Sequence, residues 1–528
     1  MSAQVMGRLA ALPRRLSDIP RHWASRTPEA FAVSEAGGGW TWQRLTEAVD
    51  EAIDLLSRIG VRPGDRVMIV GENCVAQIAL IFAAAQIDAW SVNVNARLSP
   101  GEIDAIREHC GARRTIYTVV VSPDATEHAA RHAAVRQVLP ILGELAVGGL
   151  NEACTAEPVA EDGAEQVAAL VYTTGTTGHP KGVMLTHRNL LFIADTSSRM
   201  RQLCPEDRVY GVLPISHVYG LASVTLGTLY AGAMLHVVPR YSPQGLIDAL
   251  ENDGITVLQG VPAMYARLLE YTHGNWSPEQ LRVRPRFIYA GGSPLDPTLK
   301  QEVERVFGQP LHNGYGMTES SPTISQTRVE APRTDTSVGP AIPGIELRIV
   351  DRDGQDVVEG APGELWVRGP NVMKGYYREP ELTAEAMRPG GWLNTGDLAR
   401  RDADGALFIV GRTKELIIRS GFNVYPVEVE AALNSHPAVT QSAVVGREVA
   451  DGNEEVVAFV ELDPACKVGA DELQKYLAQR LSPYKCPAEI VVMPSLPAAA
   501  TGKILKGLLK QLANGRHPVA SAGLAAIN

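Results

Sequence analysis

The segment at residues 171–183, with the sequence VYTTGTTGHPKGV, constrains this chain more than any other. An apolar run of strand type precedes it at residues 166–172, so the Gly/Thr-rich part is expected to be a loop that leaves a β-strand. Glycines let backbone amides approach an anion, while hydroxyls and an ammonium group add donors, which suits a polyphosphate. The residues expected to act in this way are Thr173, Thr174, Gly175, Thr176, Thr177, Gly178 and Lys181.

The glycine spacing differs from that of the Walker A nucleotide loop. Walker A has four residues between its glycines and ends in Gly-Lys-Ser/Thr, whereas Gly175 and Gly178 are closer together and Pro180 precedes Lys181. A flexible polar turn is the alternative interpretation of this segment alone. Four threonines and three glycines around one lysine are unusual for a plain turn, so we favour phosphate binding.

The decapeptide TTGTTGHPKG resembles the phosphate loop of the adenylate-forming superfamily, which includes acyl-CoA synthetases, adenylation domains of peptide synthetases and luciferases. Further segments resemble motifs of this family in the family's order, so the resemblance covers nearly the whole chain. They are LPISHVYG at 213–220, YAGGSP at 289–294, NGYGMTE at 313–319, GWLNTGD at 391–397, GRTKEL at 411–416 and ATGK at 500–503.

The length of 528 residues exceeds what one hydrophobic core usually holds and indicates at least two domains. Strand and helix patterns alternate from residue 31 to 121, which favours a mainly parallel sheet with helices on both faces. The resemblance implies an α/β fold with two domains. Residues 1–412 would form a large N-terminal domain of mixed and parallel sheets layered with helices, and residues 413–528 a small mobile α+β lid. Residues 148–163 are expected to be a surface connection.

Charge and composition indicate which binding partners and which cellular compartment to expect. The balance of 49 basic and 59 acidic residues, without a basic run, argues against nucleic acid as a main partner. Six scattered cysteines without a CxxC pair favour free thiols in a reducing cytoplasm, and the N-terminus lacks the pattern of a secretory signal. The apolar stretch 76–92 contains Gln77, Gln86 and Asp88, so a buried helix is favoured over a membrane span. Peripheral membrane contact and the oligomeric state, including a homodimer, stay open.

By the resemblance, the motifs supply an ATP and acid site. Tyr315 would stack on adenine, Thr318 would contact the α-phosphate, and Asp397 and Arg412 would bind the ribose. Mg²⁺ would be held by Glu319 together with Thr174. Residues expected around the acyl group or the nucleotide are His217, Tyr219, Gly220, Gly291, Gly292 and Gly316. Taken singly, His217 is as compatible with a core histidine, and Asp397 and Arg412 with a turn acid and a surface cation.

The same resemblance places Lys503 as the catalytic lysine, Lys414 at the hinge between the domains, and Ser420, Gly421 and Phe422 in a loop that lines the CoA tunnel. It implies a carboxylic acid:CoA ligase that uses ATP, Mg²⁺ and coenzyme A to activate a fatty or aryl acid. An adenylation enzyme that loads a carrier protein and a non-catalytic nucleotide-binding protein are the alternatives. Residues 213–230 contain no acid, which disfavours an amino acid substrate, and no Arg or Lys that would invite a second carboxylate. Medium or long fatty acids and aryl or arylpropenoic acids stay open.

Overall fold

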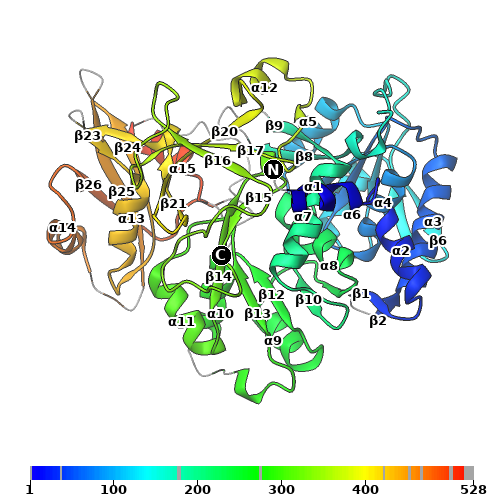
Figure 1. Cartoon of the computed structure of the whole chain (residues 1–528), viewed down its shortest axis with the longest axis horizontal. Coiled ribbons are helices and arrows are strands. Elements are labelled where there is room, and N and C mark those ends of the chain that lie inside the picture. Colours follow the sequence, from blue (N-terminus) through cyan, green and yellow to red (C-terminus); the bar gives the residue numbers. More distant parts are fainter. Residues whose placement is uncertain are drawn as a thin grey trace. The chain divides into compact units, whose positions relative to one another are not determined.

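A computed structural model describes residues 3–35, 38–174, 180–272, 276, 278–419, 422–449, 453–463, 466, 468–498 and 504–515 (Figure 1). The chain divides into two compact units. Unit 1 comprises Met1–Leu347, Trp366–Thr395 and Gly405–Leu407, and unit 2 comprises Arg348–Leu365, Gly396–Asp404 and Phe408–Asn528. The predicted α/β class, with a large N-terminal and a smaller C-terminal part, is confirmed. The division at residue 412 stays a prediction.

The first eight-stranded sheet of unit 1 has the order β15-β14-β13-β12-β10-β11-β1-β2. All neighbouring strands are parallel except the pairs at the two edges, β1 with β2 and β14 with β15. The bounds are β1 Phe31–Glu35, β2 Gly38–Thr41, β10 Arg208–Gly211, β11 Met234–Val237, β12 Val257–Gly260, β13 Phe287–Ala290, β14 Leu311–Gly316 and β15 Thr323–Gln326.

The second eight-stranded sheet has the order β18-β9-β8-β4-β3-β5-β7-β6. Its centre, from β8 to β5, is parallel, and its outer strands are antiparallel. The bounds are β3 Arg66–Gly71, β4 Trp90–Asn95, β5 Arg114–Tyr117, β6 Val135–Leu139, β7 Gly143–Val147, β8 Val167–Thr174, β9 Pro180–Thr186 and β18 Gly375–Tyr376. The expected strand before the phosphate loop is therefore β8.

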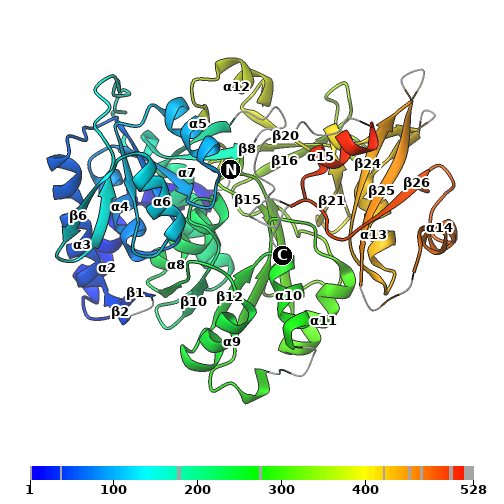
Figure 2. The ribbon, with the colours of Figure 1, turned by 180° about the vertical axis from the view of Figure 1, so that it is seen from behind.

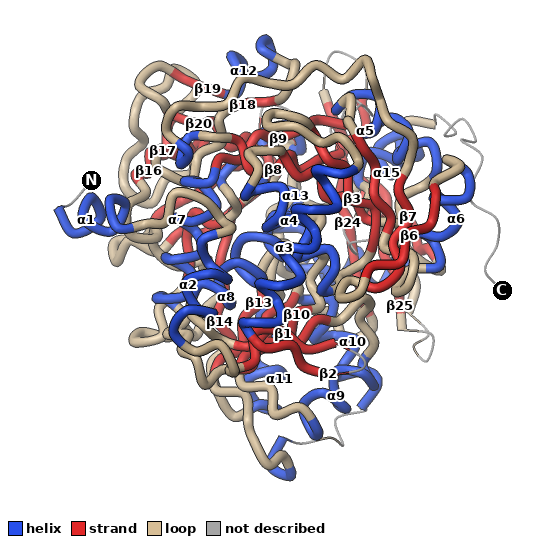
Figure 3. Tube along the Cα trace, turned by 90° about the vertical axis from the view of Figure 1, so that its right-hand side faces the viewer, coloured by secondary structure: helices blue, strands red, loops and turns tan. Residues whose placement is uncertain are grey.

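Helix α4, Val75–Gln86, contacts β1 of the first sheet and β3 and β4 of the second (Figure 3). Nearly every side chain of α4 is buried, because helices enclosed by sheets need apolar residues all round. The expected buried helix is confirmed, but it does not extend to residue 92. The chain turns at Asp88, which has a φ of 57°, and enters β4. Among the described residues, no helix is long and apolar enough to cross a membrane.

Several of the remaining helices of unit 1 begin at a side-chain cap. The side chain of Thr41 accepts a hydrogen bond from the Arg44 amide at the start of α3, and Ser99 and Glu102 form a capping box on α5. The bounds are α1 Ala3–Ala11, α2 Asp18–Arg26, α3 Trp42–Arg58, α5 Pro100–Cys110, α6 Pro123–Arg131, α7 His187–Met200, α8 Gly227–Tyr230, α9 Pro243–Asn252, α10 Pro262–Thr272, α11 Pro297–Phe307 and α12 Pro380–Ala386.

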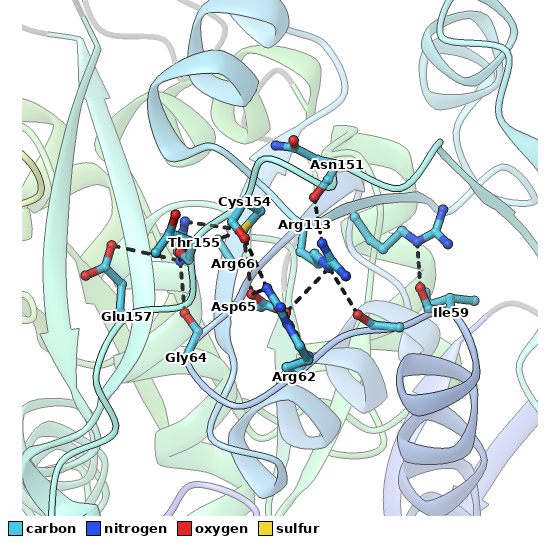
Figure 4. A network of polar contacts seen from close by, with 12 residues as sticks. Ile59, Arg62, Gly64, Asp65, Arg66, Arg113, Asn151, Cys154, Thr155 and Glu157 are labelled. Atoms are coloured by element: carbon cyan, nitrogen blue, oxygen red, sulfur yellow. Dashed lines mark hydrogen bonds and ion pairs between the residues drawn. The ribbon is translucent and has the colours of Figure 1, made fainter.

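The expected surface connection at residues 148–163 is surface-like only in part, because its middle is fixed to the start of β3 (Figure 4). The fully buried Arg66 donates hydrogen bonds to the backbone oxygens of Gly64 and Thr155, at 2.9 and 2.8 Å. Glu157 in turn accepts a hydrogen bond of 2.6 Å from the Tyr377 hydroxyl. A buried guanidinium requires several acceptors, and this connection supplies two of them, the Thr155 oxygen and the Cys154 sulfur.

Unit 2 contains a three-stranded sheet of the order β24-β25-β26, with bounds Val439–Glu448, Glu454–Leu462 and Glu489–Met493. Helices α13, Pro426–Asn434, and α14, Ala470–Ala478, cover one face (Figure 1). Helix α15, Lys506–Ala513, covers the other face, where Leu509 packs on Ala443 and Val445 (Figure 2). Val444 points to the opposite core, as strand alternation requires. The α+β composition expected for the C-terminal part is confirmed.

Short strands also occur over residues 346–424. They are β16 Glu346–Val350, β17 Gly363–Arg368, β19 Met387–Arg388, β20 Trp392–Arg401, β21 Leu407–Arg412, β22 Ile417–Arg419 and β23 Phe422–Val424. Strands β22 and β23 pair as an antiparallel hairpin within unit 2. This hairpin encloses residues 420 and 421, which lie outside the described part of the chain.

Candidate active site

The hairpin of β8 and β9 forms the base of the predicted phosphate loop. Its register places Thr173 opposite Lys181 and Thr174 opposite Pro180. The loop between the strands lies outside the described residues, and so does the side chain of Thr174. The phosphate roles of Thr174, Gly175, Thr176, Thr177 and Gly178 therefore stay predictions.

Strand β18 extends this hairpin and brings an aromatic residue beside Lys181. Tyr376 is the register partner of Val183, and the Tyr377 amide donates a 2.8 Å hydrogen bond to the Gly182 carbonyl. The Lys181 Nζ atom lies 5.6 Å from the centroid of the Tyr376 ring, within the range of a cation–π contact. Tyr376 was not predicted from the sequence, where the available signal was the pair of tyrosines that follows Gly375.

The hydroxyl of Tyr376 donates a hydrogen bond of 2.7 Å to Oε1 of Glu319. Burial raises the pKa of Tyr376, and the negative charge of Glu319 raises it further, so the phenol stays a neutral donor around neutral pH. Tyr376 thus joins Lys181 and Glu319, which the sequence separates by well over a hundred residues. The structure brings together the predicted phosphate cation and the predicted metal ligand.

Glu319 lies in the 3₁₀ turn η4, Thr318–Ser320, directly after β14. Its backbone oxygen accepts a 2.9 Å hydrogen bond from the Met373 amide, and the side chains of Thr318 and Glu319 are both buried. Within the described residues there is no group of three or more His, Cys, Asp or Glu that could hold a metal alone. A single carboxylate is sufficient as the protein ligand of a magnesium ion that is coordinated mainly by a polyphosphate.

Gly316 at the end of β14 cannot carry a side chain. A Cβ atom there would lie 1.9 Å from the Pro322 carbonyl oxygen, which follows a cis Ser321–Pro322 peptide bond. Tyr315, one residue earlier, is half-buried and is the register partner of Ser325. The close backbone approach therefore requires glycine at residue 316, while adenine stacking by Tyr315 stays a prediction.

His217 precedes a π-helix, η2, Tyr219–Leu226, which continues as α8. The apolar sequence of this segment fits a regular helix equally well, and the wider π-winding is frequent at functional sites. His217 is exposed, so it is not a core histidine, and its Nδ1 accepts a 3.2 Å hydrogen bond from the Tyr219 amide. A Cβ at Gly220 would lie 2.1 Å from the Pro214 carbonyl oxygen, so this glycine permits a close backbone contact.

The glycine turn after β13 lies against an aromatic pair. The rings of Tyr219 and Tyr289 meet edge to face with centroids 6.1 Å apart. A Cβ at Gly291 would lie 3.0 Å from the Tyr289 ring and 3.5 Å from the Tyr219 ring, and Gly292 has a φ of +84°. The structure therefore places the predicted acyl-site residues Tyr219, Gly291 and Gly292 side by side.

Asp397 on β20 and Arg412 at the end of β21, both in unit 2, form an ion pair of 3.0 Å between Oδ1 and Nε. The Asp397 side chain is 5% exposed and that of Arg412 is 49% exposed. The two predicted ribose ligands therefore lie together, and their contact with ribose stays a prediction.

The predicted hinge and CoA-side residues lie in unit 2. Lys414 is exposed in the 3₁₀ turn η5, Thr413–Glu415. Phe422 is 56% exposed and stacks on Tyr484 with ring centroids 4.7 Å apart. Ser420, Gly421 and the predicted catalytic Lys503 lie outside the described residues.

Two family models match segments of this chain. Residues 20–377 match the family described as AMP-binding enzyme, and residues 428–503 match the AMP-binding enzyme C-terminal domain. A feruloyl-CoA synthase of Amycolatopsis sp is 34% identical over 498 residues, which cover 94% of this chain and 98% of that protein. A 2-succinylbenzoate–CoA ligase of Geobacillus sp. is 33% identical over 495 residues, which cover 92% and 95%.

The o-succinylbenzoate coenzyme A synthetase of Bacillus subtilis, solved in complex with ATP and magnesium ion, has a similar structure. It matches with a TM-score of 0.79 and 30% identity over 93% of this chain and 99% of that chain. The same synthetase, solved with its acyl-adenylate intermediate, matches with a TM-score of 0.78.

Proposed function

Because this chain belongs to the AMP-binding enzyme family of adenylate-forming proteins, we infer that it is an AMP-forming carboxylic acid:CoA ligase. We propose that its acid is an aryl, arylalkanoic or arylpropenoic acid. The observation that carries the ligase assignment is the contact chain from Lys181 through Tyr376 to Glu319. It brings together the predicted phosphate-binding cation and the predicted metal ligand, which adenylation requires.

The first half-reaction is the attack of the acid's carboxylate oxygen on the α-phosphorus of ATP, which breaks the bond to pyrophosphate and forms an acyl-adenylate. Both reactants are anionic, so the site must neutralise charge and hold an in-line geometry. Lys181 offsets charge on the departing phosphates. Glu319 fits a magnesium ion bound to them, which would supply further charge neutralisation when present.

The second half-reaction is the attack of the CoA thiol on the acyl carbon, which forms the thioester and releases AMP. Lys503, on the C-terminal module, bridges the carboxylate and the α-phosphate only during adenylation. A rotation about Lys414 then withdraws Lys503 and brings the loop at residues 420–422 to the adenylate. This two-state scheme is supported by the assignment of the lysine and the phosphate loop to different family segments.

The aryl class is supported by two observations. Relatives that match over nearly their whole length are named for ferulate and for 2-succinylbenzoate, which both carry a benzene ring. The predicted acyl turn at Gly291 and Gly292 also lies against the Tyr219 and Tyr289 rings, and aromatic pairs favour a further ring in edge or offset contact.

The test is pyrophosphate release from ATP with acetate, octanoate, palmitate, benzoate, 3-phenylpropanoate and 4-coumarate, each with and without CoA. The proposal expects release with ring-bearing acids that turns over only when CoA is added. Faster turnover with octanoate or palmitate would overturn the aryl assignment. Stoichiometric release that CoA fails to accelerate would instead indicate a carrier-protein acceptor.

A further inference from the structure

Five buried polar side chains gather where Arg201, at the end of α7, and Tyr219, at the start of η2, meet the first sheet. They form what we call the buried polar cluster: Arg201, Tyr219, Gln259, Tyr289 and Gln326. Gln259 is the register partner of Tyr289, and Gln326 is the register partner of Gly314, so each pair shares one face. The Tyr289 hydroxyl would lie 2.0 Å from a Cβ at Gly314, and Arg201 Cζ lies 4.8 Å from the Tyr289 ring centroid.

The cluster has an unusual number of unpaired polar atoms. Within the described part of the chain, no hydrogen-bond partner is found for Nε and Nη2 of Arg201, Oη of Tyr219, or either amide atom of Gln259 and Gln326. Arg201, Gln259 and Gln326 are all 0% exposed. Nearly all buried polar atoms in native proteins are hydrogen-bonded, so a set of unpaired ones in one place indicates a site that receives a polar group.

The chemistry of Arg201 indicates which polar group this is. Its Nη1 donates a 3.0 Å hydrogen bond to the Ser223 carbonyl, and no described carboxylate lies within ion-pair distance of it. A buried charge normally has a counter-charge. The unpaired Nε and Nη2 atoms form one edge of the guanidinium, and their two parallel N–H bonds match the two oxygens of a carboxylate.

The cluster adjoins the predicted acyl site. Gly291 lies against the Tyr219 and Tyr289 rings, and Arg201 lies on the Tyr289 face. We propose that Arg201 is a specificity-determining residue that binds a second carboxylate, carried by the acid at the end remote from its reacting carboxyl group. This inference rests on the proposed function, since it presumes that an aryl acid lies between Gly291 and Arg201. The segment 213–230 contains no Arg or Lys. The fold instead supplies the positive charge of Arg201, from the end of α7.

The competing account is structural, because the bond from Arg201 to Ser223 also ties the end of α7 to η2. A purely structural arginine would affect all acids alike. A specificity residue separates acids that differ only at the remote end, so the discriminating quantity is a ratio of kcat/KM values between matched acids.

The wild-type enzyme provides the first test. Pyrophosphate release with CoA is measured for 3-(4-carboxyphenyl)propanoate, 3-(4-methylphenyl)propanoate and 3-(4-hydroxyphenyl)propanoate. The carboxyl compound is expected to exceed the methyl compound in kcat/KM by at least about 100-fold, mainly through KM. A methyl or hydroxyl compound that is used equally well or better would overturn the proposal and leave the aryl ligase assignment intact. Turnover of palmitate and none of these three would overturn the proposed function itself.

Variants provide the second test. Arg201→Met keeps a long buried side chain without the charge, and we expect it to reduce the carboxyl-to-methyl ratio by about 100-fold and to leave the methyl compound active. Arg201→Lys should restore part of the ratio. Arg199→Met is the matched control, because Arg199 lies on the same helix but is 62% exposed and pairs with Asp195. An unchanged ratio in Arg201→Met would overturn the proposal. If that variant fails to fold, the wild-type comparison decides alone.

Discussion

Tyr376 donates a hydrogen bond of 2.7 Å from its hydroxyl to Oε1 of Glu319, and the same ring lies 5.6 Å from Nζ of Lys181. The three residues come from β18, η4 and β9, which are far apart in the sequence. An aromatic residue with a polar end can contact a cation with its face and orient a carboxylate with its hydroxyl. These contacts predict that Tyr376 positions the predicted phosphate and metal ligands.

Tyr376→Phe should weaken the use of magnesium–ATP. A hydrogen bond to a charged group contributes about 1.5 to 3 kcal/mol, so KM for magnesium–ATP should rise roughly 10-fold or more. The measurement is pyrophosphate release as a function of magnesium–ATP concentration. Tyr377→Phe is the matched control, because it removes the bond to Glu157 and leaves Glu319 untouched. Equal effects of both changes would contradict the positioning role.

Asp397→Asn should impair recognition of the ribose. The amide keeps the shape of the side chain but loses the charge that pairs with Arg412 at 3.0 Å and that would accept ribose hydroxyls. We expect KM for ATP to rise about 10-fold and KM for 2′-deoxy-ATP and 3′-deoxy-ATP to change less. Kinetics with these three nucleotides provide the measurement. A variant that still discriminates between them as the wild type does would argue against ribose contact.

Gly316→Ala should destabilise the protein. The new Cβ would lie 1.9 Å from the Pro322 carbonyl, so the backbone must shift, at a cost of about 2 kcal/mol or more. The melting temperature and the activity should fall together. Gly101→Ala near the start of α5 is the control, because nothing lies within 4 Å of its added Cβ. A melting temperature unchanged in both variants would show that the strand end adapts.

His187 should make the protein less stable at acidic pH. Burial, followed by the charge of Arg15, lowers its pKa to about 3 from the ordinary 6.5. Between these values the unfolded chain binds a proton that the folded chain does not, so stability falls as pH drops through this window. Relative to His187→Gln, the wild type should lose about 2 to 3 kcal/mol more between pH 7.5 and pH 4.5.

Unfolding at the two pH values measures this difference, since carboxylates that titrate in the same range affect both proteins. The glutamine removes the titrating imidazole, whose Nδ1 accepts a 3.2 Å hydrogen bond from the Leu16 amide. His22→Gln, a change at an exposed histidine, is the control. Parallel pH profiles for wild type and His187→Gln would rule out this origin of acid sensitivity.

Lys503→Ala should separate the two half-reactions. Removing one transition-state donor is expected to slow adenylation by roughly 100- to 1000-fold. Thioester formation from supplied acyl-adenylate should be largely spared, because the lysine is withdrawn in that step. Single-turnover assays of each half-reaction provide the measurement. Equal losses in both would contradict the two-state scheme.

Much of the secondary structure could be predicted from short sequence patterns. The strand predicted before the phosphate loop appears as β8, and the predicted alternation of strands and helices over residues 31–121 appears as the elements from β1 to β5. The π-winding of η2 was not predictable, because its apolar sequence fits a regular helix equally well. Neither was the end of α4 before residue 92, since an apolar run looks the same in a helix and in a buried strand.

The sequence by itself determined the family and which residues are candidates for the chemistry, since a glycine loop, a lone lysine and a glutamate in ordered motifs are recognisable one by one. Only the tertiary structure decided which of them meet. Tyr376 links Lys181 to Glu319 because β18 pairs with β9, and Arg201 faces Tyr289 because the end of α7 packs on the first sheet. Contacts of this kind join residues far apart in the chain, and their energies depend on burial and register, which no local pattern encodes.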